Sequence, residues 1–185
     1  HTRLQGDWRS DVCSSDLSVL ERALQQGLGL VQVREAALDA GERERFARAA
    51  LDRVRASGGL LVVNSDLELA RRIGADGCHL TAQRLLASSD RPEFEWVGAS
   101  CHTRAELEHA AALGLDYALL GPVQPTATHP DQAGLGWARF GELIEGLPIP
   151  VFALGGLTQN DMSEARDAGA HGIAAIRGVW GAKDA

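Results

Sequence analysis

The stretch PVFALGGLTQNDMSEARDAGAHGIAAIRGVW, residues 150–180, carries the pattern that decides the fold. An apolar run at 151–154 ends in Gly155-Gly156, and a second apolar run at 172–176 follows a segment with helical spacing. Strand, glycine turn, helix and strand in this order are typical of a parallel β-α-β unit. The two strands of such a unit end at the same edge of the sheet, so their end residues are expected to lie close together.

The ends of these two strands predict a phosphate site. Backbone N–H groups at Gly155-Gly156, just ahead of a helix, suit an anion. In (β/α)8 barrels the loops after the last two strands often form such a site. Arg177 ends the second strand, and its planar guanidinium matches phosphate oxygens. The alternative for the two glycines is an ordinary surface turn.

Composition limits the classes of protein to consider. A chain of 185 residues with 45% hydrophobic residues is long enough for one domain with a real core. Its apolar runs are far shorter than the ~18–20 residues that span a bilayer, so no membrane partner is expected. A net charge of −7 without a basic stripe argues against a nucleic-acid partner. Three scattered cysteines indicate a reducing compartment, so a cytoplasmic location is expected.

The first seventeen residues, HTRLQGDWRSDVCSSDL, differ from the rest of the chain. They show neither the helical nor the strand period of apolar residues, and RSDVCSSDL resembles translated sequencing-adapter read-through. We therefore expect residues 1–17 to be a non-native or disordered segment and residues 18–185 to form the folded domain. A poorly ordered N-terminal arm is the alternative.

From Ser18 onward, helical and strand patterns alternate without a break. Strands are predicted at 30–34, 60–64, 77–80, 96–100, 117–120, 151–154 and 172–176, with a helical segment after each of the first six and another at 18–26. The helix at 18–26 has no strand before it. The pattern therefore predicts an α/β fold, a (β/α)8 TIM barrel truncated at its N-terminus with the first strand missing. An open doubly wound sheet is the alternative.

Hydrogen-bonding and titratable side chains gather where the predicted strands end, which is where this architecture places chemistry. These residues are Gln32, Arg34, Glu35, Asn64, Asp66, His79, Ser100, Cys101, His102, the loop at 126–129, Gly155, Gly156 and Arg177. Single members have structural alternatives, because Asn64, Asp66 and Thr103 are suited to capping helices.

Among these residues, His102 is the candidate general acid or base, because imidazole titrates near neutral pH. A histidine that only caps a helix is the alternative. Cys101 precedes His102 directly, and neighbours on a strand point to opposite faces, so a Cys–His couple is disfavoured. Asp66 and His79 are the only nearby metal candidates, which is a thin set of ligands for Mg²⁺.

Six motifs in this order, VQVRE, LVVNSDLELARRIGADGCHL, GASCHT, YALLGPVQPTATH, FALGGLT and AGAHGIAAIRG, resemble the thiamine phosphate synthase/TenI superfamily. The resemblance spans Ser18 to Trp180. The chain is most similar to the synthase-like domain fused behind a Nudix hydrolase in some bacteria. This similarity implies a Nudix domain in the parent chain. The family folds as a (β/α)8 barrel, and its synthases join hydroxymethylpyrimidine diphosphate to thiazole phosphate with Mg²⁺, releasing pyrophosphate.

The resemblance also implies roles for individual residues. Ser100 and His102 match the family's catalytic S-x-H, and the two glycines match those that hold the thiazole phosphate. The expected substrate-binding residues are Gln32, Arg34, Asn64, His79, Thr126, Thr128, His129, Gly155, Gly156 and Arg177.

Several positions depart from the family's pattern. Ser65 and Arg84 replace the two metal-binding carboxylates, which leaves Asp66 as a weak candidate ligand and puts Mg²⁺ in doubt. Ala36 and His129 replace two lysines, and Arg177 replaces a serine. Three functions remain: a thiamine phosphate synthase acting on small phosphorylated thiazole and pyrimidine substrates, a metal-independent thiazole tautomerase, or a non-catalytic ligand sensor for a Nudix hydrolase.

Overall fold

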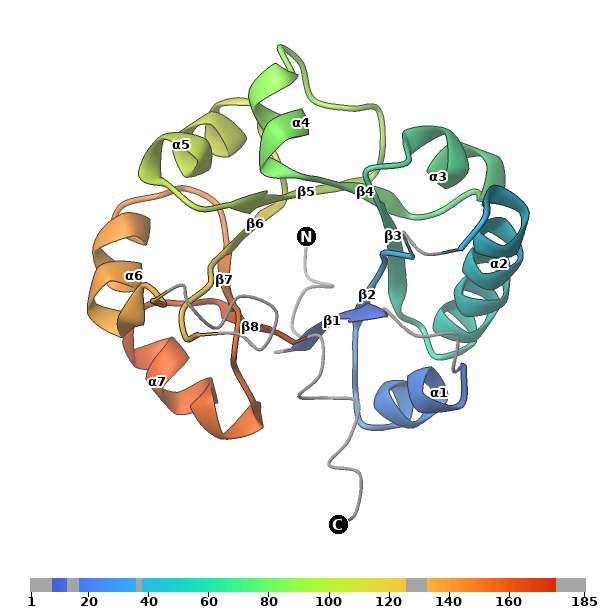
Figure 1. Cartoon of the computed structure of the whole chain (residues 1–185), viewed down its shortest axis with the longest axis horizontal. Helices are drawn as coiled ribbons and strands as arrows, with labels where there is room; N and C mark the ends of the chain where they lie inside the picture. Colours follow the sequence, from blue (N-terminus) through green and yellow to red (C-terminus); the bar gives the residue numbers. More distant parts are fainter. Residues whose placement is uncertain (1–7, 13–16, 36–37, 126–132, 176–185) are drawn as a thin grey trace.

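The computed structural model describes residues 8–12, 17–35, 38–125 and 133–175. Eight parallel strands hydrogen-bond in chain order and close into a barrel, seen from one end in Figure 1. A closed ring rules out the open doubly wound sheet. The strands are β1 (Trp8–Val12), β2 (Leu30–Val33), β3 (Leu60–Asn64), β4 (Gly77–Leu80), β5 (Trp96–Cys101), β6 (Tyr117–Leu120), β7 (Val151–Leu154) and β8 (Gly172–Ala175).

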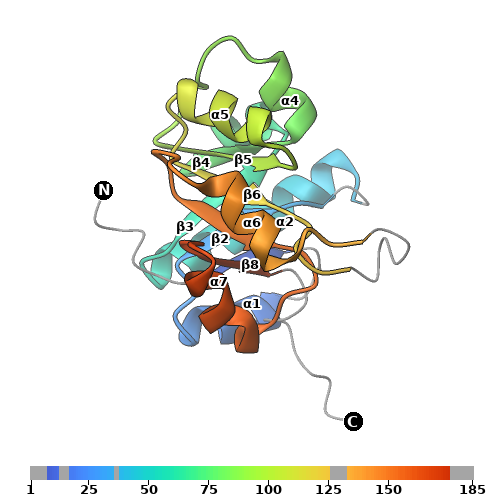
Figure 2. The same ribbon diagram turned by 90° about the vertical axis from the view of Figure 1, so that its left-hand side faces the viewer.

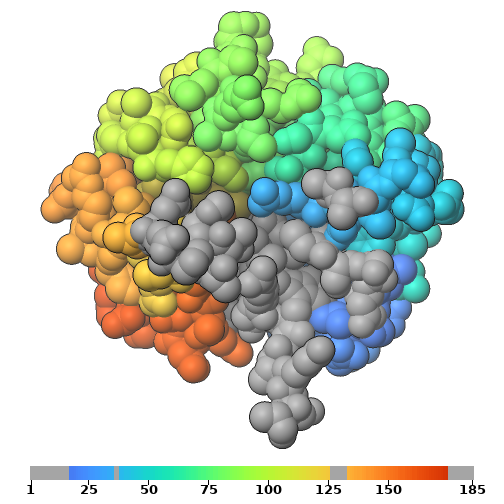
Figure 3. All heavy atoms as spheres, in the orientation of Figure 1, coloured from blue at the N-terminus to red at the C-terminus, as the bar shows by residue number. Residues whose placement is uncertain are grey.

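A helix follows each strand from β1 to β7, and these helices form the outer layer of the molecule. They are α1 (Leu17–Gln25), α2 (Ala40–Ala56), α3 (Leu67–Ile73), α4 (Ala82–Ala87), α5 (Arg104–Ala112), α6 (Gly136–Ile144) and, after the short 3₁₀ helix η2 (Gln159–Asp161), α7 (Met162–Asp167). Figure 2 shows the strands between α4 and α5 on one side and α1 and α7 on the other. In Figure 3 the colours show successive segments of the chain following one another around the ring. Across the described residues, no helix has the length and apolarity to cross a membrane.

The first strand is present, which corrects the expectation that it would be missing. Residues 8–12 form β1, whose backbone pairs with β2 at Arg9↔Leu30 and with β8 at Trp8↔Ile173. Without β1 the edges of β2 and β8 would expose unpaired N–H and C=O groups. The pairing depends on the backbone, and the short segment WRSDV carries little apolar pattern to announce it. That residues 1–17 are foreign to the protein stays a prediction.

Successive side chains of a strand point alternately into the barrel and outward, and this alternation builds two apolar layers. Side chains that point inward fill the barrel, and those that point outward pack against the helices. The inner cluster consists of Leu30, Leu60, Val62, Trp96, Tyr117, Leu119, Phe152 and Ala174. Each large side chain buried in this way contributes about 1.5–3 kcal/mol, so the two layers together hold the rim of the barrel in place.

One close approach inside the barrel requires a glycine. A Cβ atom added at Gly98 would lie 2.0 Å from the Tyr117 ring, so the ring occupies the space that a side chain on β5 would fill. Tyr117 is buried and packs edge-to-face against Phe152, with ring centroids 6.3 Å apart. Its hydroxyl is thereby directed toward the polar residues above the core, where the candidate site begins.

Candidate active site

Polar side chains from four neighbouring strands converge inside the barrel at its carboxyl end. Gln32 Nε2 donates to Asn64 Oδ1 across β2 and β3, at 3.3 Å. His79 Nε2 lies 2.8 Å from Ser100 Oγ across β4 and β5. Asn64 and His79 are direct partners in the register of β3 and β4. The structure therefore brings together four of the residues expected from the sequence, and it does so on one continuous arc of the rim.

His79 is the buried centre of this arc. It is fully buried, and its Nδ1 lies 3.1 Å from the Tyr117 hydroxyl while its Nε2 contacts Ser100. Both ring nitrogens are thus engaged by hydroxyl groups, each of which can donate or accept. His79 is not open to a metal ion, and it would act on a ligand through Ser100, which is half-buried. Tyr117 was not identified from the sequence, since an aromatic residue at the start of a strand gives no signal of this contact.

His102 lies just beyond the end of β5 and is exposed. Its Nδ1 is 2.7 Å from the carbonyl oxygen of Gly121 at the end of β6. A carbonyl only accepts hydrogen bonds, so Nδ1 carries the hydrogen, and Nε2 of the neutral ring keeps a lone pair for proton transfer. His102 takes part in the capping of α5 only through its backbone: Glu106 Oε2 accepts from the N–H of His102 at 2.5 Å and of Thr103 at 3.0 Å. The ring is therefore available as an acid or base.

Cys101 has no part in this chemistry. Its side chain belongs to the outer core cluster, fully buried between the strands and the helices. Burial raises the pKa of the Cys101 thiol to about 12, so the thiol stays protonated at neutral pH and is a poor nucleophile. The prediction that Cys101 and His102 point to opposite faces is confirmed, because His102 reaches over the rim to Gly121.

The diglycine turn lies on the same rim, next to His102. Gly155 and Gly156 have φ values of 99° and 69°, and Cβ atoms there would lie 2.6 Å from Pro122 Cα and 2.7 Å from the Pro125 carbonyl oxygen. Both positions therefore require glycine. Within the described part of the chain, no group accepts a hydrogen bond from either N–H. These two amides can bind an anion, and the neighbouring strands β7 and β8 end together as expected.

Four of the expected site residues, Thr126, Thr128, His129 and Arg177, lie outside the described residues. Their predicted roles stay predictions. The loop that carries the first three is tied to the turn at its near end, since Gln124 N–H donates to the Gly155 carbonyl at 3.1 Å.

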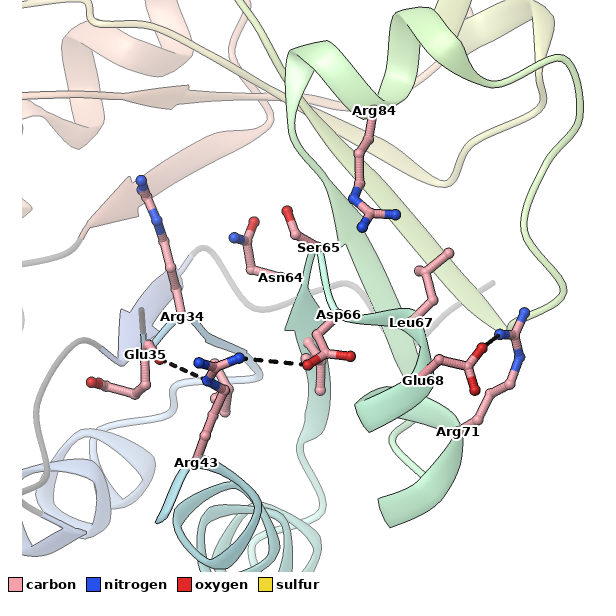
Figure 4. Close-up of a pocket in the computed structure, with 12 residues that line it drawn as sticks. Arg34, Glu35, Arg43, Asn64, Ser65, Asp66, Leu67, Glu68, Arg71 and Arg84 are labelled. Carbon is pink, nitrogen blue, oxygen red and sulfur yellow. Dashed lines mark hydrogen bonds and ion pairs between the residues drawn. The ribbon is translucent and has the colours of Figure 1, made fainter. Parts of the chain in front are cut away.

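On the opposite side of the rim, the ends of β2 and β3 and the nearby helices surround a cavity of about 640 Å³ (Figure 4). Its charged lining consists of four arginines and three carboxylates, Arg34, Arg43, Arg71, Arg84, Glu35, Asp66 and Glu68, with Asn64 and Ser65 at its floor. Arg43 and Arg71 were missed from the sequence, since nothing in the pattern of a helix marks which of its many arginines faces a neighbouring strand.

The residues of this cavity do not fit Mg²⁺. Asp66 Oδ1 accepts from the N–H of Leu69, which caps α3 as expected, and Asp66 Oδ2 lies 3.6 Å from Arg43. Glu68 pairs with Arg71 at 2.7 Å. Among the described residues, no three His, Cys, Asp or Glu side chains are grouped to hold a metal ion. Mg²⁺ prefers several free oxygen ligands, and here Asp66 and Glu68 are already paired with arginines.

Comparison with known proteins agrees with this architecture. Residues 8–179 match the family described as "Thiamine monophosphate synthase" (TMP-TENI). "Thiamine-phosphate synthase" of Bacillus velezensis is 32% identical over 182 residues, which is 95% of this chain and 81% of that protein. The protein of the same name from Synechococcus is 35% identical over 184 residues, 94% of this chain, and the chain spans only 50% of that protein's length.

A solved structure gives the same result. "Thiamine phosphate pyrophosphorylase" from Pyrococcus furiosus superposes with a TM-score of 0.85 and 25% identity, covering 100% of this chain and 92% of that one. The match begins at residue 8, where β1 begins. On the evidence of the sequence match, the relatives and the barrel with its polar rim, this chain belongs to the thiamine monophosphate synthase family.

Proposed function

We propose that the chain is a thiamine phosphate synthase that joins a thiazole phosphate to hydroxymethylpyrimidine diphosphate at the carboxyl rim of the barrel. One observation carries the proposal. His102 is bonded to the carbonyl of Gly121, and the adjacent Pro122 packs against Gly155. An acid/base group and a phosphate-binding turn are thereby held on either side of the same short segment.

The chemistry assigns a task to each side of the rim. The amides of Gly155 and Gly156 hold the phosphate of the thiazole, and His102 Nε2 lies beside it for proton transfer. The pyrimidine takes the inner arc, where Gln32 and Asn64 can donate and accept hydrogen bonds. The thiazole nitrogen then forms a bond to the methylene carbon of the pyrimidine, and diphosphate leaves that carbon with the electron pair of the broken C–O bond. Fixed donors that stabilise the departing charge are the main source of rate enhancement in such a step.

The experiment is direct. The purified chain is incubated with both substrates, and thiamine phosphate is quantified by its fluorescent oxidation product after chromatography. Product in proportion to the chain supports a synthase. No product from a chain that is folded by circular dichroism contradicts it.

A thiazole tautomerase is the second candidate, and the geometry of His102 favours it. The residue is exposed and its tautomer is set by Gly121, which suits a proton shuttle that needs neither diphosphate nor Mg²⁺. Isomerisation of the thiazole phosphate without any pyrimidine, followed by NMR, distinguishes this activity. Isomerisation without thiamine phosphate formation would assign the chain to the tautomerase.

The resemblance to domains fused behind Nudix hydrolases supports a third hypothesis, a cytoplasmic sensor that binds the phosphate and turns nothing over. In the arginine-lined cavity Asp66 and Glu68 are paired with arginines, which agrees with a site that does not bind Mg²⁺. Calorimetry with thiazole phosphate, in EDTA and in Mg²⁺, is the test. Tight binding without turnover in either assay supports the sensor, and turnover in either assay contradicts it.

A further inference from the structure

Three residues form one row across the neighbouring strands β4, β5 and β6. In the strand register His79 is the partner of Gly98, and Gly98 is the partner of Tyr117. A Cβ atom at Gly98 would lie 2.0 Å from Tyr117 Cζ, so the phenol ring occupies the side-chain space of β5. The ring thereby crosses β5, and its hydroxyl oxygen lies 3.1 Å from His79 Nδ1. The missing side chain at Gly98 is what allows the two rings to meet.

Ser100 stands next to this row, further along β5 toward the rim. It comes two positions after Gly98, and residues two apart in a strand point to the same face, so its hydroxyl also points into the barrel. Ser100 Oγ lies 2.8 Å from His79 Nε2, and in the described part of the chain its hydroxyl makes no other hydrogen bond. His79 and Tyr117 are buried and Ser100 is half-buried. Of the three polar side chains, Ser100 is therefore the one that can meet a ligand.

The phenol decides the direction in which the hydrogen bonds run. A neutral imidazole has one N–H group and one lone pair, so it accepts from one of its two hydroxyl partners and donates to the other. A phenol is a stronger acid than an aliphatic alcohol and is therefore the better donor. The Tyr117 hydroxyl then donates to Nδ1 of His79, and the Nε2–H group donates to Ser100 Oγ. The hydrogen of the Ser100 hydroxyl is left to turn toward the rim of the barrel.

We propose that Tyr117 is a positioning residue that acts through His79 to make the Ser100 hydroxyl a fixed hydrogen-bond donor to the ligand. The ligand group that fits is an uncharged atom with a lone pair. The proposed function identifies this atom as a ring nitrogen of the pyrimidine, and only that identity rests on the proposed function. A donor that is already oriented needs no rearrangement during the reaction, which is how such groups raise the rate.

The first test is nitrogen-15 NMR of His79 in the full chain, because the chemical shift of each ring nitrogen shows whether it carries a hydrogen. We expect a bare Nδ1 and a protonated Nε2. Tyr117→Phe keeps the ring but removes the donor to Nδ1, so it should give a mixture of the two tautomers. Ser100→Ala is the matched control and should leave Nδ1 bare, since the phenol remains. A hydrogen on Nδ1 in the unmodified chain would overturn the inference.

The second test is a double-mutant cycle in turnover. Tyr117→Phe should lower kcat about 3- to 10-fold, as expected for one hydrogen bond, with KM changed less than about twofold. In the Ser100→Ala background the same substitution should lower kcat no further, because the residue through which Tyr117 acts is gone. An equal loss in both backgrounds would assign Tyr117 a merely structural role and refute the inference.

Val62→Ala separates this effect from a general loss of stability. Val62 fills the same inner cluster, but its side chain has no hydrogen-bonding group. This variant should therefore lose stability while kcat and the tautomer of His79 stay unchanged; a fall in kcat equal to that of Tyr117→Phe would count against the inference. Should the chain form no thiamine phosphate, the proposed synthase fails, and the NMR comparison alone decides the role of Tyr117.

Discussion

The β2–β4 side of the rim and the β5–β7 side hold their functional groups in different ways. On the first side, long charged side chains from strand ends and helices surround an open cavity. On the second side, backbone groups dominate: the two glycine amides, and a carbonyl that orients His102. We therefore expect the first side to recognise charge, and the second to recognise shape and move a proton.

The two sides also differ in how readily their residues can be replaced. The β5–β7 side is built into the fold, because Gly155, Pro122 and Gly121 are packed against one another and a side chain at Gly155 would collide. The β2–β4 side can be altered by exchanging exposed side chains that the barrel core does not touch. The resemblance implies that Ser65 and Arg84 replace metal-binding carboxylates of the family, which predicts that the use of a metal can change on this side while the barrel stays intact.

The largest expected effect falls on the β5–β7 side. His102→Gln keeps a donor for the Gly121 carbonyl but removes the proton-transfer group, so turnover should fall about 10²- to 10⁴-fold. Affinity for thiazole phosphate should be unchanged, because the amides of Gly155 and Gly156 remain in place. Steady-state kinetics and calorimetry measure the two.

Cys101→Ala provides the control for the His102 variant. The thiol is buried on the outer face of β5, and its pKa near 12 keeps it protonated. We expect catalysis to be retained, apart from a small loss of stability from the missing sulfur. Loss of turnover in this variant with normal turnover in His102→Gln would reverse the assignment.

The second largest expected effect concerns His79, which lies between the two sides. His79→Leu leaves the buried hydroxyl of Tyr117 and the hydroxyl of Ser100 without their imidazole partner. The free energy of unfolding should fall by about 2–4 kcal/mol, measured by urea denaturation. Tyr117→Phe removes only one of the two contacts and should cost about half as much; a larger loss there than in His79→Leu would show that the phenol has the leading role.

Much of the fold is visible in the sequence because local signals and packing agree. The strands at 60–64, 77–80, 117–120 and 151–154 and the helix at 82–87 have the predicted bounds. Asp66 and Thr103 cap their helices as expected. The first strand was missed because its pairing uses backbone groups of β2 and β8, far along the chain, and its short sequence has little apolar pattern.

For the site, the sequence could predict only which residues lie at the ends of strands, not what their side chains contact. Parallel strands predict that Ser100, His102 and the diglycine turn share one rim, and they do. What each side chain contacts depends on neighbours distant in sequence: His79 meets Tyr117 thirty-eight positions away, and Arg43 meets Asp66. These contacts decide that His79 is inaccessible and that Asp66 is paired, and no local pattern encodes them.

The third largest expected effect tests whether the diglycine turn is as rigid as the comparison of the two sides of the rim implies. Gly156→Ala places a Cβ 2.7 Å from the Pro125 carbonyl oxygen at a φ of 69°. The strain should cost about 1–2 kcal/mol of stability, and thiazole phosphate should bind more weakly, since the amides shift. Gly114→Ala is the matched control, with the same positive φ and open space around it: it should lose similar stability without changing phosphate affinity. Equal affinity losses in both variants would refute the anion site.

The smallest effect belongs to Glu35, at the edge of the charged cavity. Its Oε1 is buried with no hydrogen-bond partner among the described residues, and burial raises the pKa of this carboxyl above 4.5. An acid whose pKa is raised on folding contributes stability that is complete below the ordinary pKa and is lost as pH rises through the folded value. Glu35→Gln should therefore stabilise the fold at neutral pH, by about 0.5 kcal/mol or less, and this gain should vanish below about pH 4. Thermal melts at several pH values measure it; a gain that persists in acid would mean that packing, rather than ionisation, is responsible.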